Sequence, residues 1–264
     1  MPDPARLIVV ADRAELARRA GAEVERLATA AIAERGAFHV ALAGGSTPRE
    51  LYEHLSSAEA LELGRWHAWF GDERCVPPDD ERSNFRMVRR ALLEPGKIPR
   101  AHWHPMYLSA NASAYLSANA SGDLSANAAG FDAVGEPEAA ARAYEDELGR
   151  FLGPEPRLDL ALLGMGADGH TASLFPGDAA LDAGERKVVA VPAGEGREVA
   201  RLTLSIGVLS SARALLFLVA GEEKRATLRS ILADAPAARA LPAARVSAAH
   251  ADPLWIADRS AAGS

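Results

Sequence analysis

Cysteine is nearly absent from this sequence of 264 residues, which contains a single one, Cys75. An intramolecular disulfide is therefore impossible, and a hydrophobic core must stabilise the fold. Long apolar segments are absent as well: none is long enough to span a membrane, and residues 1–6 lack the apolar stretch of a secretion signal. We therefore expect a protein that has no membrane partner and works in the cytoplasm.

An excess of positive charge is also missing. The chain has 29 Lys and Arg against 36 Asp and Glu, a net charge of -7, and no basic run. This balance argues against nucleic acid as a partner. A protein of this charge that binds an anionic metabolite needs a local group of cations and backbone amides.

The spacing of metal ligands is missing too. His102 and His104, with His67 elsewhere, have no third ligand at a suitable spacing. We expect no metal and no cofactor.

Apolar runs alternate with helical patterns along the chain. Strands are expected at residues 7–10, 38–43, 66–70, 158–163, 188–191, 201–204, 214–220 and 254–257. Helices are expected at residues 12–35, 84–93, 137–151 and 222–233, with another near Pro48 and a loop at 71–83. This alternation predicts an α/β fold with a mostly parallel, Rossmann-like sheet and helices on both faces. No linker divides the chain, so we expect one domain over residues 1–264.

One segment, at about residues 107–130, departs from this pattern. The motif Leu-Ser-Ala-Asn-Ala begins at Leu108, Leu116 and Leu124, a period of eight. Its polar and alanine-rich composition supplies too little apolar surface for a core, so we expect a low-complexity insertion at the surface. Deletion of this segment should leave activity largely intact.

The most informative segment is 158–177. Its apolar run, 158–163, predicts a strand buried on both faces, and the glycine-rich turn that follows carries Asp168 and His170. The carboxyl ends of central strands are where open α/β sheets bind ligands. A histidine there, close to a carboxylate, suits proton transfer near neutral pH. The alternative is a turn in which the aspartate caps a helix and the histidine is surface.

A second turn, Gly44-Gly45-Ser46-Thr47, also follows an expected strand and precedes a helix. Glycines let backbone amides approach an anion, hydroxyls add donors, and the helix N-terminus adds partial positive charge. The alternative is an ordinary turn, and in either case we expect Thr47 to cap the helix. The turn is a candidate phosphate site.

Three cations follow or begin other strands. Arg74, next to Asp72, lies after the strand at 66–70, Arg201 begins a strand, and Lys224 lies in an early helical turn where a bound anion would favour it. For Arg74 and for Lys224 the alternative is a solvated charge. Cys75 beside Arg74 is a weak candidate nucleophile, because no histidine lies nearby in the sequence to act as its base.

Taken together, five motifs resemble those of the 6-phosphogluconolactonases, in the glucosamine-6-phosphate isomerase/6-phosphogluconolactonase family. They are Ala43-Gly-Gly-Ser-Thr-Pro48, Trp69-Phe-Gly-Asp-Glu-Arg74 with Ser83-Asn84, Leu163-Gly-Met-Gly-Ala-Asp-Gly-His170 through Ser173-Leu-Phe-Pro-Gly177, Arg201-Leu-Thr-Leu204 and Gly221-Glu-Glu-Lys224. They occur in the family's order across nearly the whole chain, apart from the insertion.

The resemblance implies a phosphosugar isomerase/deaminase-like fold and hydrolysis of 6-phospho-D-glucono-1,5-lactone to 6-phosphogluconate in the pentose phosphate pathway. His170 would be the general base, and Asp168 or another carboxylate would orient it. The phosphate would bind Gly44, Gly45, Ser46 and Thr47, with Arg74, Lys224 and Arg201 as cations and Asp72 also contacting the substrate. Glucosamine-6-phosphate deaminases share the fold, but they carry an acidic residue where this chain has Phe175 and tend to have tyrosine where it has Arg74.

Two rival functions remain open at this point: an isomerase or deaminase on the same fold, and a sensor that binds sugar phosphates without catalysis. His170 weighs against the sensor, since binding alone does not require a base. The partner is a small sugar phosphate in each case. The sequence leaves the oligomeric state and the oxyanion donors open, although we favour a monomer.

Overall fold

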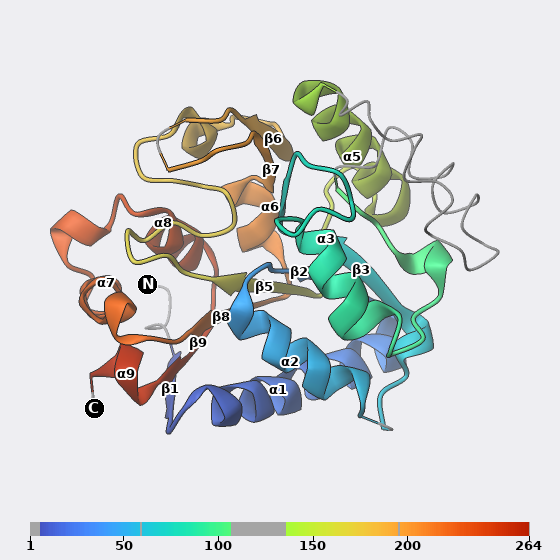
Figure 1. The fold of residues 1–264 in the computed structure, drawn as a ribbon, viewed down its shortest axis with the longest axis horizontal. Coiled ribbons are helices and arrows are strands. Elements are labelled where there is room, and N and C mark those ends of the chain that lie inside the picture. Colours follow the sequence, from blue (N-terminus) through green and yellow to red (C-terminus); the bar gives the residue numbers. More distant parts are fainter. Residues whose placement is uncertain (1–5, 59, 107–135, 195, 264) are drawn as a thin grey trace.

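The main sheet of the computed structural model, which describes residues 6–58, 60–106, 136–194 and 196–263, has six strands that all run parallel (Figure 1). In spatial order the strands are β1 (Arg6–Val10), β9 (Pro253–Asp258), β8 (Ala214–Val219), β5 (Leu160–Gly164), β2 (Phe38–Leu42) and β3 (Trp66–Phe70). The prediction of a mostly parallel α/β sheet is confirmed.

Strand order fixes where a ligand can bind. From β2 the chain moves outward to β3, then returns to place β5 on the other side of β2 and continues through β8 to β9. The order therefore reverses between β2 and β5, and open sheets of this kind bind ligands in the crevice beyond such a reversal. β5 is buried on both faces, as its apolar sequence predicts, whereas β1 at the sheet edge is largely exposed.

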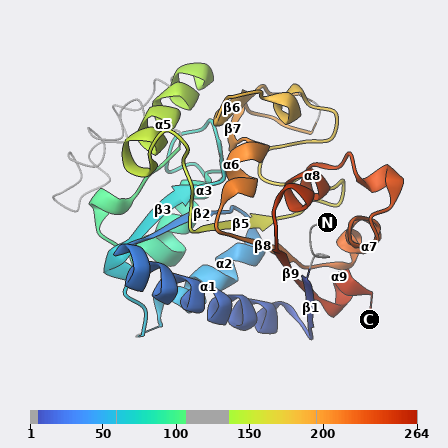
Figure 2. The same ribbon diagram turned by 180° about the vertical axis from the view of Figure 1, so that it is seen from behind.

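Helices cover both faces of this sheet. On one side α1 (Arg13–Arg35) packs against α2 (Ser46–Ser56), and on the other α6 (Ile206–Ser211) packs against α8 (Pro242–Ala249), as the opposite views in Figures 1 and 2 show. The other α-helices in the described ranges are α3 (Asn84–Val88), α5 (Pro137–Leu152), α7 (Arg225–Leu232) and α9 (Arg259–Ala262). Short 3₁₀ turns occur at Leu63–Arg65, Arg100–His102, Ala179–Asp182, Glu222–Lys224 and Pro236–Ala238. No helix within the described ranges is long and apolar enough to cross a membrane.

A second, smaller sheet was not predicted. Its strands are β4 (Asp72–Arg74), β7 (Arg201–Leu204) and β6 (Val188–Val191), and both pairings are antiparallel. The expected loop at 71–83 is therefore wrong at its start, because Asp-Glu-Arg forms a strand. Pairing with β7 overrides the low strand preference of these charged residues. This pairing places Arg74 directly opposite Arg201.

The helices agree with expectation at the start of α1 and differ from it elsewhere. α1 begins as predicted, with the Asp12 carboxylate accepting from the Glu15 amide at 2.8 Å. The helix expected at 84–93 is α-helical to Val88 and then π-helical over Arg89–Leu93. α6, α8 and α9 were missed, since helices of four to eight residues carry little periodic signal. The insertion at 107–130 lies outside the described residues, and a single domain over 1–264 remains a prediction.

Candidate active site

A cavity of about 310 Å³ lies beyond the carboxyl ends of β2, β3, β5 and β8. Nine predicted site residues line it: Gly44, Gly45, Ser46, Thr47, Asp72, Arg74, His170, Arg201 and Lys224. The tenth predicted residue, Asp168, is not in the lining but contacts His170, which is. Lining residues that the sequence reasoning did not assign include Arg13, Asn84 and Glu223. Loops far apart in the sequence thus meet at the crevice created by the reversal of strand order.

The glycine-rich turn after β2 is held rigidly from behind. Tyr52, fully buried in α2, donates its hydroxyl hydrogen to the Ala43 carbonyl at 2.8 Å and accepts from the Ala43 amide at 2.9 Å. Gly45 has a φ of 101°, which favours glycine, and serves as the N-cap of α2. The expectation that Thr47 caps this helix is wrong, because α2 begins at Ser46 and no side chain caps it. The first turn of α2 therefore opens into the cavity without a capping side chain.

Gly44 is required for a different reason. A Cβ atom on Gly44 would lie 1.9 Å from Oδ1 of Asn84, so the asparagine amide fills the space that a side chain would need. The same amide donates to the carbonyl of Asp72 at 3.0 Å and to its carboxylate at 3.1 Å. Asn84 therefore connects the glycine turn to the strand that carries the cavity carboxylate. The pair Ser83-Asn84 was part of the recognised motif, but nothing in the sequence assigned this contact.

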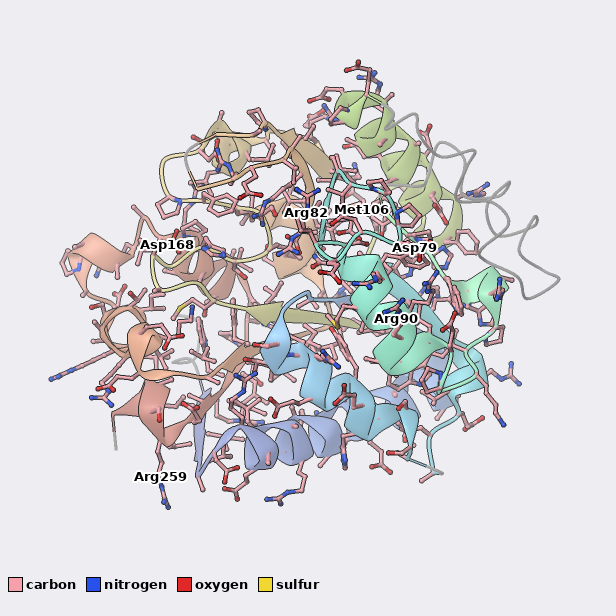
Figure 3. All side chains as sticks on the ribbon, in the orientation of Figure 1. Asp79, Arg82, Arg90, Met106, Asp168 and Arg259 are labelled. Carbon is pink, nitrogen blue, oxygen red and sulfur yellow. The ribbon has the colours of Figure 1, made fainter. Side chains whose placement is uncertain are left out.

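His170 and Asp168 form a hydrogen-bonded pair on the loop after β5, where Figure 3 labels Asp168. Nδ1 of His170 lies 2.6 Å from a carboxylate oxygen of Asp168, and the His170 amide donates to the same oxygen at 3.1 Å. Burial raises the pKa of Asp168, but the hydrogen bonds and the charge of His170 outweigh it and lower the pKa overall. Because an ionised carboxylate can only accept, Nδ1 is the nitrogen that carries the hydrogen in the neutral form of the ring, and Nε2 is then the nitrogen with the free lone pair.

Glycine makes this pairing possible. A Cβ on Gly166 would lie 2.1 Å from Nδ1 of His170 and 2.5 Å from the Asp168 carboxylate. Gly169, between the two partners, has a φ of 82°. The Gly-Met-Gly-Ala-Asp-Gly-His sequence thus packs an imidazole and a carboxylate against bare backbone.

Asp72 is fixed from two sides. Its carboxylate accepts from Asn84 and also, at 2.6 Å, from the hydroxyl of Ser173, which follows the His170 turn. This contact joins the small sheet to the loop after β5. The side chain of Asp72 is 6% exposed and lines the cavity.

Glu73, the neighbour of Asp72, points away from the cavity into a hydrogen-bond network. Its carboxylate accepts from the amides of Arg74, Asn84 and Phe85 at 2.7, 2.8 and 2.7 Å and from the Ser83 hydroxyl at 3.0 Å. Burial raises the pKa of Glu73 to about 7, although these amides act in the opposite direction. The network attaches the start of α3 to β4 and so fixes the strand that presents Asp72 and Arg74.

The cavity is electropositive. Four cations line it, Arg13, Arg74, Arg201 and Lys224, against two carboxylates, Asp72 and Glu223. Burial and the neighbouring Arg74 lower the pKa of Arg201, a sign of concentrated positive charge. Arg13, from the first turn of α1, pairs with Glu50 at 3.1 Å, and Lys224 lies 3.8 Å from Glu223. A polyanion such as a phosphate monoester fits this surface.

Cys75 does not act as a nucleophile in this arrangement. It is 7% exposed, and burial together with the charge of Glu73 raises the pKa of its thiol to about 12. The reactive thiolate is therefore scarce near neutral pH.

Four histidines gather away from the cavity, a cluster that the sequence analysis did not foresee in full. The His67 ring stacks on those of His39 and His102, with centroids 4.5 and 4.1 Å apart, and its Nδ1 lies 3.1 Å from Nε2 of His104. His104 in turn contacts Glu147 at 2.6 Å. No group of three or more His, Cys, Asp or Glu within the described ranges has an arrangement that could hold a metal ion.

Comparisons with known proteins agree with the motifs. Residues 11–255 match the family described as glucosamine-6-phosphate isomerases/6-phosphogluconolactonase. The chain is 39% identical over 237 residues to the 6-phosphogluconolactonase of Synechocystis sp., covering 88% of this chain and 87% of that protein. Its identity to the 6-phosphogluconolactonase of Mycobacterium tuberculosis is 34% over 237 residues, covering 88% and 87%.

Solved structures show the same similarity. The 6-phosphogluconolactonase of Trypanosoma brucei has a TM-score of 0.81 and 29% identity, covering 100% of this chain and 99% of that chain. A monomeric glucosamine-6-phosphate deaminase has a TM-score of 0.73 at 20% identity and covers 98% and 99%, which shows a shared fold. The family resemblance predicted from the motifs is confirmed.

Proposed function

Because the chain belongs to the glucosamine-6-phosphate isomerase/6-phosphogluconolactonase family, we propose that it hydrolyses 6-phospho-D-glucono-1,5-lactone to 6-phosphogluconate in the pentose phosphate pathway. The observation that carries this proposal is the position of His170. Its ring is paired with Asp168 and lines the same cavity as the glycine-rich turn and four cations. A base and an anion site in one cavity fit a substrate with a hydrolysable ester at one end and a phosphate at the other.

The phosphate binds at the start of α2 in this proposal. The amides of Gly44 to Thr47 and the hydroxyls of Ser46 and Thr47 donate hydrogen bonds to it. Lys224, Arg74 and Arg201 balance its charge from the opposite walls. Positioning the ester over His170 by its distant anion lowers the entropic part of the barrier.

The proton transfers follow from the His170 tautomer. Nδ1–H donates to Asp168, so Nε2 takes a proton from water as the water oxygen adds to the lactone carbonyl. The Asp168 carboxylate stabilises the imidazolium that forms. When the tetrahedral intermediate collapses, the bond from C1 to the ring oxygen breaks and the ring oxygen receives that proton. The products are a carboxylic acid and a hydroxyl, and the reaction as written needs no metal or redox cofactor.

The test is a proton-release assay with freshly made lactone, corrected for spontaneous ring opening. We expect His170→Ala to lower kcat about 10²–10⁴-fold, the usual contribution of a general base, while 6-phosphogluconate still binds. His54→Gln is a matched control, because His54 lies exposed in α2 outside the cavity lining. Unchanged turnover in His170→Ala would refute the base, and absence of lactonase activity in the wild type would refute the function.

A further inference from the structure

Phe175 is not one of the residues that line the cavity, but its ring contacts two residues that do, His170 and Arg201. Its ring centroid lies 4.8 Å from that of His170, with the planes tilted by 35°. The guanidinium carbon of Arg201 lies 5.5 Å from the same ring and that of Arg197 lies 4.6 Å away. One side chain thus contacts the candidate base and a candidate anion-binding cation, which come from different sheets.

The local sequence explains why this ring is well fixed. In Phe175-Pro176-Gly177-Asp178 the Asp178 amide donates to the Phe175 carbonyl at 3.2 Å, and Gly177 has a φ of 75°. Proline followed by glycine at positive φ is the signature of a type II turn. The turn brings Asp178 next to Arg197, and the two side chains form a largely buried ion pair. Arg197 therefore lies over the Phe175 ring while its charge is bound by the same turn.

The Phe175 ring is one of the groups that hold the guanidinium of Arg201 in place. Its Nε is buried and has no hydrogen-bond partner within the described ranges. Arg74, opposite it on the neighbouring strand, and Arg197 repel it, whereas the carboxylates of Asp72 and Glu73 attract it. The negative face of an aromatic ring attracts a guanidinium, so Phe175 offsets part of that repulsion.

His170 gains orientation from the same contact. The hydrogen bond from Nδ1 to Asp168 fixes one edge of the imidazole, and small rotations about the side-chain torsions still change the direction of Nε2. Contact with the Phe175 ring restricts this rotation and so fixes the direction of Nε2. Small errors in the placement of a base cost large factors in rate.

We propose that Phe175 is a positioning residue for the lactone hydrolysis: its ring orients His170 and Arg201 together and so sets the distance between the proton-transfer atom and the anion site. The inference rests on the proposed function. It requires an aromatic ring at position 175, whereas a merely space-filling role would be met by any apolar side chain of similar size.

The experiment compares F175L, which keeps an apolar side chain without a π face, with F175Y, which keeps the ring. For F175L we expect kcat about tenfold lower and the Kd for 6-phosphogluconate, measured by calorimetry, about five- to tenfold higher, as loss of a cation–π contact predicts. F175Y should stay within about twofold of the wild type in both. F151L is a matched control, since Phe151 is 43% exposed on α5 and also carries an arginine, Arg150, over its ring.

A double-mutant cycle separates positioning from general loss of structure. R201Q weakens binding by itself, and F175L should add little to the Kd in the R201Q background because the partner is gone. Full additivity, or equal losses in F175L and F175Y, would overturn the proposal. A wild type that binds 6-phosphogluconate but lacks lactonase activity would instead defeat the proposed function, and the Kd cycle would still decide whether Phe175 positions Arg201.

Discussion

Acid should destabilise this protein through the histidine cluster of His39, His67, His102 and His104. Burial, above all, lowers the pKa of His39 to about 4 and that of His67 to about 3, from an ordinary value of 6.5. Nearby histidines lower both values further, and Asp159 opposes the shift at His39. Burial also lowers the pKa of His104, although Glu147 acts in the opposite direction.

The sign follows from proton binding in the two states. Below pH 6.5 the unfolded chain binds protons at His39 and His67, whereas the folded chain keeps His39 neutral down to about pH 4 and His67 down to about pH 3. Proton binding therefore stabilises the unfolded state relative to the folded state as the pH falls, and stability is lost from pH 6.5 down to about pH 4 through His39 and about pH 3 through His67. At full strength each of these two rings lowers the free energy of unfolding by about 2 kcal/mol between pH 7 and pH 5. Both rings are partly exposed, so we discount this to roughly 1 kcal/mol each, or about 2 kcal/mol together.

The assay is urea unfolding at pH 7 and pH 5, for the wild type and for His67→Gln. The variant is less stable overall, because it loses the contact with His104, but its loss of stability on acidification should be smaller by about 1 kcal/mol. His54→Gln, outside the cluster, should keep the wild-type pH dependence. Equal pH dependence in His67→Gln and wild type would refute the assignment of the acid response to this cluster.

Three further predictions concern the cavity. Gly44→Ala should lower kcat/KM by about tenfold or more in a steady-state assay, since the new Cβ displaces the Asn84 amide. The control is Gly64→Ala, whose Cβ meets open space and should leave kcat/KM unchanged. Lys224→Met should raise KM with little change in kcat, as loss of a contact made equally in ground and transition states predicts. Glucosamine 6-phosphate should release no ammonia in a coupled assay, because Phe175 beside His170 cannot titrate, and stoichiometric release would contradict this reading.

The parallel sheet could be predicted from local sequence because its strands are short apolar runs, and β2, β3, β5 and β8 have glycine at or soon after their ends. The run at 158–163 and the turn with Asp168 and His170 indicated both a buried strand and its carboxyl edge, and β5 occupies that place. The glycine-rich turn, Arg74 and Lys224 each follow such a strand, whereas Arg201 begins β7 of the small sheet. The parallel topology alone brings the ends of β2, β5 and β8 to one edge.

What could not be predicted depends on partners distant in the sequence. Asp72 to Arg74 becomes a strand only because β7 lies beside it, and residues 72–74 contain no apolar alternation. Asn84 packs against Gly44, which lies 40 residues earlier in the sequence, and no local sequence pattern indicates this contact. The histidine cluster draws on separate strands and a loop, so its four members give no spacing that a sequence search recognises.

Two sheets of different topology both contribute side chains to the cavity. The deeply packed parallel sheet carries the imidazole and the glycine turn, and the three-stranded antiparallel sheet carries the guanidinium groups of Arg74 and Arg201. The Asp72–Ser173 hydrogen bond and the Phe175 ring join the small sheet to the loop that carries His170. A replacement in the small sheet can therefore alter charge recognition directly and, through these contacts, also alter the placement of the base.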